Sequence, residues 1–131
     1  MNFKPASLRL LATSALCAAS LLAAPTAFAH GDAKPQHGGI VRTAGDLSFE
    51  LVAAADGATL YVIDHGKDYD TAGVSGKLTV LNGADKSEAE LKPAGGNKLE
   101  AKGVKLGAGA KVVAGLQTAG KKAVTVRFTV K

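Results

Sequence analysis

The feature that most constrains the fold is a short-range alternation of apolar and polar residues, which begins near residue 40 and recurs to the end of the sequence. Its clearest instance is the segment 124–131, where Val124, Val126, Phe128 and Val130 alternate with polar residues. A repeat of two residues puts every second side chain on the same face of a strand. Each such segment therefore predicts an antiparallel β-strand with one buried face.

Glycine, asparagine or aspartate separates these segments, and their spacing predicts about eight strands with no helix of useful length. The expected strands are 39–43, 47–51, 59–63, 77–80, 87–92, 98–102, 112–116 and 124–131. In the segment 47–51, Glu50 falls among the polar positions. The segment 59–63 has no polar face, and this indicates a strand inside the sheet. Asn82 and Gly83 predict a hairpin turn. The glycine-rich stretch 103–110 is expected to cross between two sheets.

These expectations favour an all-β domain with the architecture of an Ig-like antiparallel β-sandwich of about 7–8 strands, and a small β-barrel is the alternative. Residues 1–29 have the features of a cleaved signal peptide, since Lys4 and Arg9 precede an uncharged apolar stretch at 10–24, and the small residues Ala27 and Ala29 of a cleavage site follow it. The apolar stretch is shorter than the roughly 20 residues of a spanning helix, so we expect a periplasmic protein without membrane insertion after cleavage.

Cleavage after Ala29 leaves residues 30–131, divided into a flexible N-terminal arm at 30–38 and a β-domain at 39–131. Cys17 is the single cysteine and leaves with the signal peptide, so the remaining chain has no disulfide and no thiolate ligand. The net charge of +5 falls to +3 with the loss of Lys4 and Arg9. Lysines and acids are interspersed along the expected strands. The sequence has no cluster of arginines with aromatic residues, so we do not expect a nucleic-acid partner.

Histidine is the most informative residue type for function. Cleavage would make His30 the first residue, and its α-amine and imidazole can chelate one metal ion. His37 lies in the arm, and His65 follows Asp64 at the end of an expected strand. If the arm folds back, His30 or His37 meets His65 beside the aspartates at 64, 68 and 70. Equally simple interpretations are a solvated terminus for His30, a linker residue for His37 and a hairpin turn for His65.

A site of nitrogen and oxygen donors without sulfur suits Cu(II), Zn(II) or Ni(II), and the general affinity order favours Cu(II). A calcium site at 64–70 is less well supported, because the regular spacing of a calcium-binding loop is missing and turn-forming aspartates explain the pattern. No serine lies in a nucleophile motif, and no phosphate-binding loop precedes a helix. We therefore do not expect an enzyme.

Two motifs, His37-Gly38-Gly39 and the strand that ends in Asp64-His65-Gly66-Lys67, carry a resemblance to a known family. The chain resembles small periplasmic proteins encoded with heavy-metal efflux systems and the N-terminal β-domain of periplasmic adaptor subunits of heavy-metal RND efflux pumps. The resemblance covers most of 38–131. It implies an all-β fold and metal binding or delivery, with an efflux pump component as a partner and His37 and His65 as the matching positions.

The chain departs from pump adaptors, because it has no coiled-coil hairpin, lipoyl-like halves or membrane-proximal domain. It also lacks the methionine and tryptophan set of periplasmic Cu(I) chaperones, since Met1 is its only methionine. The leading hypothesis is a periplasmic protein that sequesters or delivers a divalent metal through His30, His37, His65 and Asp64. The alternative is a structural or interaction module that docks on an envelope protein through a sheet edge.

Overall fold

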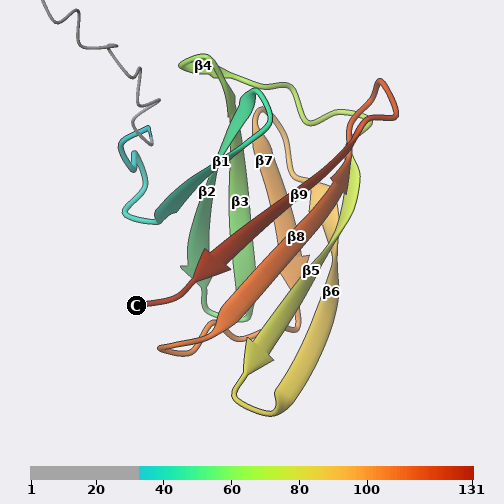
Figure 1. Cartoon of the computed structure of the whole chain (residues 1–131). Helices are drawn as coiled ribbons and strands as arrows, with labels where there is room; N and C mark the ends of the chain where they lie inside the picture. The colour runs from blue at the N-terminus through green and yellow to red at the C-terminus, as the bar shows by residue number, and fades with distance from the viewer. Residues whose placement is uncertain (1–32) are drawn as a thin grey trace, which may run out of the picture.

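The computed structural model describes residues 33–131, which form nine β-strands (Figure 1). They are β1 (Ile40–Ala44), β2 (Leu47–Ala54), β3 (Gly57–Asp64), β4 (Lys67–Asp68), β5 (Ser75–Asn82), β6 (Asp85–Pro93), β7 (Lys98–Lys102), β8 (Lys111–Gln117) and β9 (Ala123–Thr129). The expected signal peptide and His30 lie outside the described residues. Within 33–131, no helix has the length and apolar character needed to cross a membrane.

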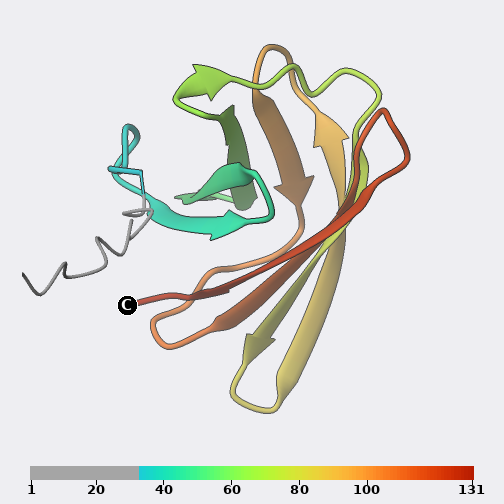
Figure 2. The same ribbon diagram turned by 45° about the horizontal axis from the view of Figure 1, so that its top comes forward.

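The strands form one curled antiparallel sheet. Their order is β1-β2-β3-β7-β6-β5-β8-β9, and β4 pairs with β3 beside this path. The two end strands, β1 and β9, contact each other, but no backbone ladder joins them (Figure 2). The all-β prediction is confirmed, and the architecture is the small barrel that was the alternative, nearly closed, in place of the two separate sheets of an Ig-like sandwich.

Strand β6 accounts for this difference between sandwich and barrel. Residues 85–91 pair with β5, whereas Lys92 and Pro93 pair with β7. Pro93 has no N–H to donate to a ladder, and proline is tolerated where a strand bends or ends. One strand thus belongs to both halves of the sheet. The alternation of residues reports which face is buried and does not report which neighbour a strand pairs with, so it fits a sandwich and a barrel equally.

The core fills the inside of the barrel with side chains from all of the long strands. The largest fully buried apolar residues are Phe49, Leu51, Leu60, Leu78, Leu91 and Leu99, together with Val62, Val80 and Val112. In β9, Val124, Val126 and Phe128 are buried and the residues between them are exposed, as the alternation predicts. Burial of this apolar surface is the main force that stabilises the fold, at roughly 25 cal/mol per Å².

Several local predictions are confirmed. β3 pairs with β2 and β7, so it is an interior strand, and 103–110 connects β7 to β8 across the two halves of the barrel. The hairpin at Asn82 exists, but its two-residue loop is Gly83 and Ala84, because Asn82 pairs with Asp85. Only Gly83 of the expected pair has a positive φ. Asn82 instead donates a side-chain hydrogen bond to the carbonyl of Lys105 at 3.0 Å.

Candidate metal site

Glu50 is completely buried, although the alternation in β2 places it among the polar positions. Phe49 and Leu51, its neighbours in sequence, face the core, so the side chain of Glu50 lies on the outer face of the sheet. The arm covers this face. Its part from Gln36 to Gly39 is fixed to β2, whereas the sequence predicts a flexible segment at 30–38.

The Glu50 carboxylate accepts four hydrogen bonds from the arm. One oxygen, Oε1, accepts from the backbone N–H groups of His37 at 2.8 Å and Gly39 at 2.9 Å. The other, Oε2, accepts from the backbone N–H of Gln36 at 3.0 Å and lies 3.0 Å from Nδ1 of the His37 ring. A buried carboxylate needs such partners, because an unpaired buried charge is very costly. The arm is therefore held by one side chain.

Burial by itself raises the pKa of Glu50. The hydrogen bonds from Gly39, from the ring and backbone of His37 and from Gln36 act in the opposite direction, because they stabilise the charged form. Together they outweigh burial and hold the pKa of Glu50 below its ordinary value. The carboxylate is thus ionised at neutral pH and presents a full negative charge to the His37 ring.

The ring of His37 is fixed on two sides. It stacks on Tyr61 with the ring centroids 3.7 Å apart and an angle of 2° between the planes. Tyr61 is the cross-strand partner of Glu50, so the two side chains that contact the ring come from paired positions of β2 and β3. Because Nδ1 faces the carboxylate, a neutral ring carries its proton there and leaves the Nε2 lone pair free. The side chain is 40% exposed, so part of the ring is open to solvent.

Gly39 is required by the close approach of the arm to β2. A Cβ at this position would lie 2.4 Å from the backbone oxygen of Leu51 and 2.9 Å from Cγ of Glu50. We expect Gly39→Ala to lower the free energy of unfolding by about 2 kcal/mol, because the backbone must move to relieve the overlap. Chemical denaturation measures this loss.

Gly115→Ala is the matched control, since nothing lies within 4 Å of a Cβ at Gly115 and its φ is not positive. It should be neutral or stabilising by up to about 1 kcal/mol. Equal stability of the two variants would contradict the close approach at Gly39.

His65 lies in a tight turn between β3 and β4. Asp64 pairs with Lys67, and the two residues between them, His65 and Gly66, have φ values of 48° and 81°. Positive φ at both central positions is typical of a type I′ hairpin, so the turn interpretation of this motif is sufficient to explain its backbone. Nδ1 of His65 contacts the carboxylate of Asp64, and the histidine side chain is 77% exposed.

The structure does not bring His37 and His65 together. His37 stacks on Tyr61, and His65 comes four residues after Tyr61 in the sequence, which corresponds to roughly 13 Å along a strand. Among residues 33–131, no group of three or more histidine, cysteine, aspartate or glutamate side chains could hold a metal ion. The pairs that the structure forms are His37 with Glu50 and His65 with Asp64. A complete site therefore needs further donors.

The surroundings of His65 are less suited to a cation than those of His37. His65 and Asp64 line a groove of about 310 Å³ whose lining also includes Lys122, a residue of the turn between β8 and β9. The ammonium group of a lysine repels a metal ion at short range. Asp70, another aspartate of this region, accepts a hydrogen bond at 2.9 Å from the backbone N–H of Ala72 and so acts as a turn residue.

Two residues of the candidate site were not expected from the sequence. Glu50 is placed among the polar positions by the period-two pattern, and no local signal distinguishes it from Ser48. Tyr61 belongs to a strand with apolar residues on both faces, where an aromatic ring needs no further explanation. Both gain their role only because the arm folds onto β2 and β3. His-Gly-Gly was a usable signal for that contact, since Gly38 has a φ of 72° and Gly39 has no room for a side chain.

The chain was compared with family models, curated proteins and solved structures, and it matches none of them.

Proposed function

We propose that this protein is a periplasmic metal-binding protein that sequesters or delivers a divalent transition metal, with His37 as its central ligand. The observation that carries the proposal is the contact between Nδ1 of His37 and the buried Glu50. Histidines that bind metals almost always hydrogen-bond their second ring nitrogen to a carboxylate, a carbonyl or a water, which fixes the tautomer and makes the free nitrogen more basic. In His37, the carboxylate of Glu50 is the partner of Nδ1, and Nε2 is the nitrogen that would bind the metal.

His30 is the natural source of the remaining donors. It precedes His37 by seven residues, and a chain of that length spans at most about 24 Å, so its amine and imidazole can reach Nε2 of His37. These donors suit Cu(II), Zn(II) or Ni(II), with Cu(II) bound most tightly. In keeping with the resemblance, an efflux pump component is the expected recipient. His65 and Asp64 form, at most, a second and weaker site.

The test is calorimetric titration of the secreted protein, with its N-terminus identified by mass spectrometry, against Cu(II), Zn(II) and Ni(II). We expect binding at micromolar concentrations or below. His37→Phe keeps a ring on Tyr61 and removes the nitrogen ligand, and it should weaken binding at least 100-fold, by about 3 kcal/mol. In the same experiment, electron paramagnetic resonance of the Cu(II) form counts the coordinated nitrogens.

His65→Asn is the matched control, because asparagine tolerates the positive φ of this turn. It should leave the affinity of the first metal ion within about threefold. Binding no tighter than millimolar, or equal affinities for the wild-type protein and His37→Phe, would refute the proposal.

The second candidate, an interaction module that docks through a sheet edge, is favoured by one observation. β1 and β9 contact each other, but no ladder of backbone hydrogen bonds joins them. Within the described residues, each of these strands therefore has one edge to which no other strand is hydrogen-bonded. Such edges can accept a strand from another protein. Capture of the same partner from periplasm with and without a chelator would favour this function, and loss of the partner with the chelator would favour metal delivery.

A further inference from the structure

The last part of the chain carries positive charge without acids. Every aspartate and glutamate lies at or before Glu100, and residues 101–131 contain seven lysines and arginines. Lysines are therefore interspersed with acids only up to Glu100. From there to the C-terminus the net charge grows with each basic residue.

The barrel gathers most of these cations on one side. Lys111 in β8 and Arg127 in β9 both point outward, and the pairing of Val113 with Arg127 sets them on neighbouring rows. Further exposed lysines flank both ends of the hairpin formed by β8 and β9. We define the cationic face as Lys105, Lys111, Lys121, Lys122, Arg127 and Lys131, all of which are exposed.

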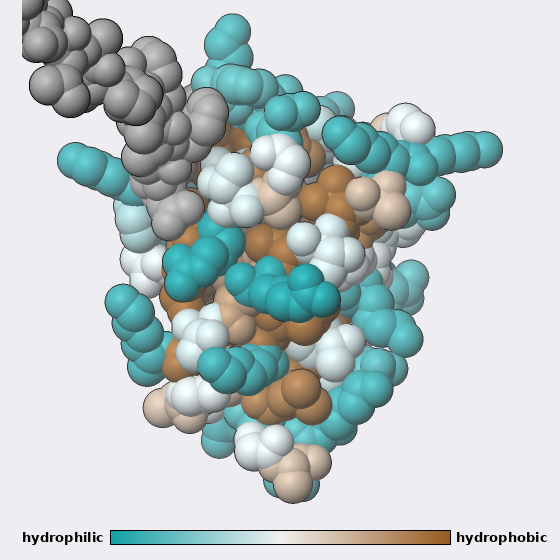
Figure 3. All heavy atoms as spheres, viewed as in Figure 1, coloured by the Kyte–Doolittle hydropathy of each residue, from teal (hydrophilic) through white to brown (hydrophobic). Residues whose placement is uncertain are grey.

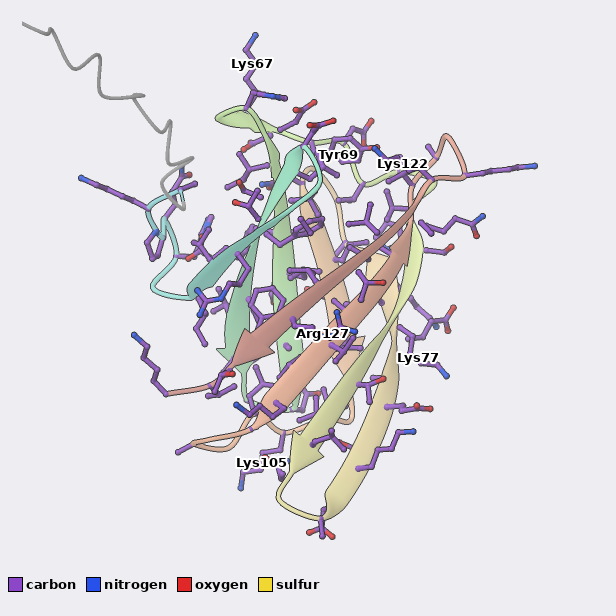
Figure 4. All side chains as sticks on the ribbon, viewed as in Figure 1. Lys67, Tyr69, Lys77, Lys105, Lys122 and Arg127 are labelled. Carbon is purple, nitrogen blue, oxygen red and sulfur yellow. The ribbon has the colours of Figure 1, made fainter. Side chains whose placement is uncertain are left out.

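The cationic face extends along the whole hairpin. Lys122 lies in the turn between β8 and β9, Arg127 lies midway, and Lys105 lies beyond the opposite end (Figure 4). The backbone of Lys105 is fixed there by the side chain of Asn82. Each strand has seven residues and so spans roughly 23 Å. This length is several times the width of a single anionic group.

No acid of the described residues pairs with the cationic face. The ion pairs of 33–131 that involve lysine use Lys77, Lys86 and Lys92 with Glu88 or Glu90, on the neighbouring strands β5 and β6. Glu88 is already shared by Lys77 at 3.1 Å and Lys86 at 3.3 Å, which lowers its pKa. Lys111 donates to the hydroxyl of Thr129, a neutral group. The charge of the face is thus left for a partner.

We propose that the cationic face adsorbs to an anionic membrane surface through lipid headgroups. Specific protein interfaces are rich in aromatic residues, arginine and methionine and poor in lysine, whereas this face has five lysines and one arginine. The exposed large hydrophobic residue of the described chain is Leu81, 37% exposed and paired across the strands with Lys111. One leucine is too little to anchor a protein partner.

The same composition fits a diffuse anionic surface. Hydrophilic side chains are spread over the front of the barrel with small apolar areas between them (Figure 3). Adsorption of this kind needs no insertion and no fixed partner geometry, because each lysine or arginine near an anionic bilayer strengthens binding about fivefold on its own. Single-stranded nucleic acid would require aromatic residues for base stacking, and the cationic face contains none.

The test is co-sedimentation of the protein, expressed with its own leader and purified, with vesicles of equimolar phosphatidylglycerol and phosphatidylcholine. We expect binding at about 0.01 M salt that weakens strongly at about 0.15 M, and none to vesicles of phosphatidylcholine alone. The triple variant Lys111→Gln, Lys122→Gln, Arg127→Gln should lower the partition coefficient about 100-fold, since three contacts of about fivefold each are lost.

The triple variant Lys67→Gln, Lys92→Gln, Lys102→Gln is the matched control, with the same change in net charge away from the cationic face. Compared at about 0.1 M salt, where the screening length is only about 10 Å, it should bind within about fivefold of the wild-type protein, because its lysines lie outside the cationic face. Equal losses in both variants, no binding to the anionic vesicles, or tighter binding to a DNA duplex or to poly-glutamate than to the vesicles would overturn the proposal. Titrating the variant Lys111→Gln, Lys122→Gln, Arg127→Gln with the same metal ions separates this proposal from the proposed function, because none of the three substitutions replaces a proposed metal ligand.

Discussion

Phe49→Ala is expected to lower the free energy of unfolding by about 4 kcal/mol. Phe49 is fully buried in β2 and packs inside the barrel, so its loss removes apolar contacts and leaves a cavity that the surrounding strands cannot close. A domain of this size has a total stability of roughly 5–15 kcal/mol, so the variant should lose between about a quarter and four-fifths of it. Urea denaturation followed by circular dichroism measures the change.

Leu81→Ala serves as the control for this experiment, since Leu81 is exposed on the outer face. It should change stability by no more than about 1 kcal/mol, well below the loss expected at Phe49. A loss below about 1 kcal/mol for Phe49→Ala would mean that the barrel interior is not packed as the structure shows.

Glu50→Gln is expected to destabilise the protein by about 3 kcal/mol at neutral pH. The amide keeps the shape of the side chain, but its NH₂ group cannot accept the two hydrogen bonds that one carboxylate oxygen receives. At Oε2 the lost partners are Gln36 and His37, and at Oε1 they are His37 and Gly39. Whichever oxygen is replaced, part of the arm loses its attachment to β2.

The difference between the two proteins should depend on pH. The pKa of Glu50 is lowered in the folded protein, so its contribution is complete above the ordinary glutamate value of 4.5 and is lost as the pH falls through the lower, folded value. The wild-type protein therefore approaches Glu50→Gln in stability as acid is added. Urea denaturation at neutral pH and at several points below pH 4.5 tests this. A difference independent of pH, or none at neutral pH, would contradict the role of the charge.

Glu100→Gln is the control, because Glu100 is exposed in β7. Its effect should stay within about 0.5 kcal/mol at every pH. Metal binding offers a second measurement on Glu50→Gln, since loss of an orienting carboxylate typically weakens metal affinity 10–100-fold.

The fold was largely predictable because the side-chain alternation of a strand is a local property. The alternation of β9 gives its buried face residue by residue, and 59–63 was identified as interior from its two apolar faces. What the alternation does not encode is pairing across the sheet. The division of β6 between β5 and β7 depends on contacts between residues far apart in sequence, and the choice of barrel over sandwich followed from it.

The candidate site was predictable only in part, for a similar reason. The metal-binding chemistry of histidine predicts His37 and His65 as ligands, and the turn interpretation of His65 follows from the Asp-His-Gly-Lys sequence. The contact of His37 with Glu50 joins residues separated by 13 positions, and Tyr61 lies further along the chain. The alternation predicts a solvated Glu50, because a pattern local to one strand carries no information about an arm that covers the outer face of β2.

The pairing of β6 with both halves of the sheet affects how the barrel unfolds. A sandwich can in principle lose one layer while the other persists, because its layers share only side-chain contacts. Here one continuous strand, β6, pairs with strands of both halves. If one half unfolds, β6 loses part of its pairing, and the other half is destabilised as well. We therefore expect the barrel to unfold as a single cooperative unit.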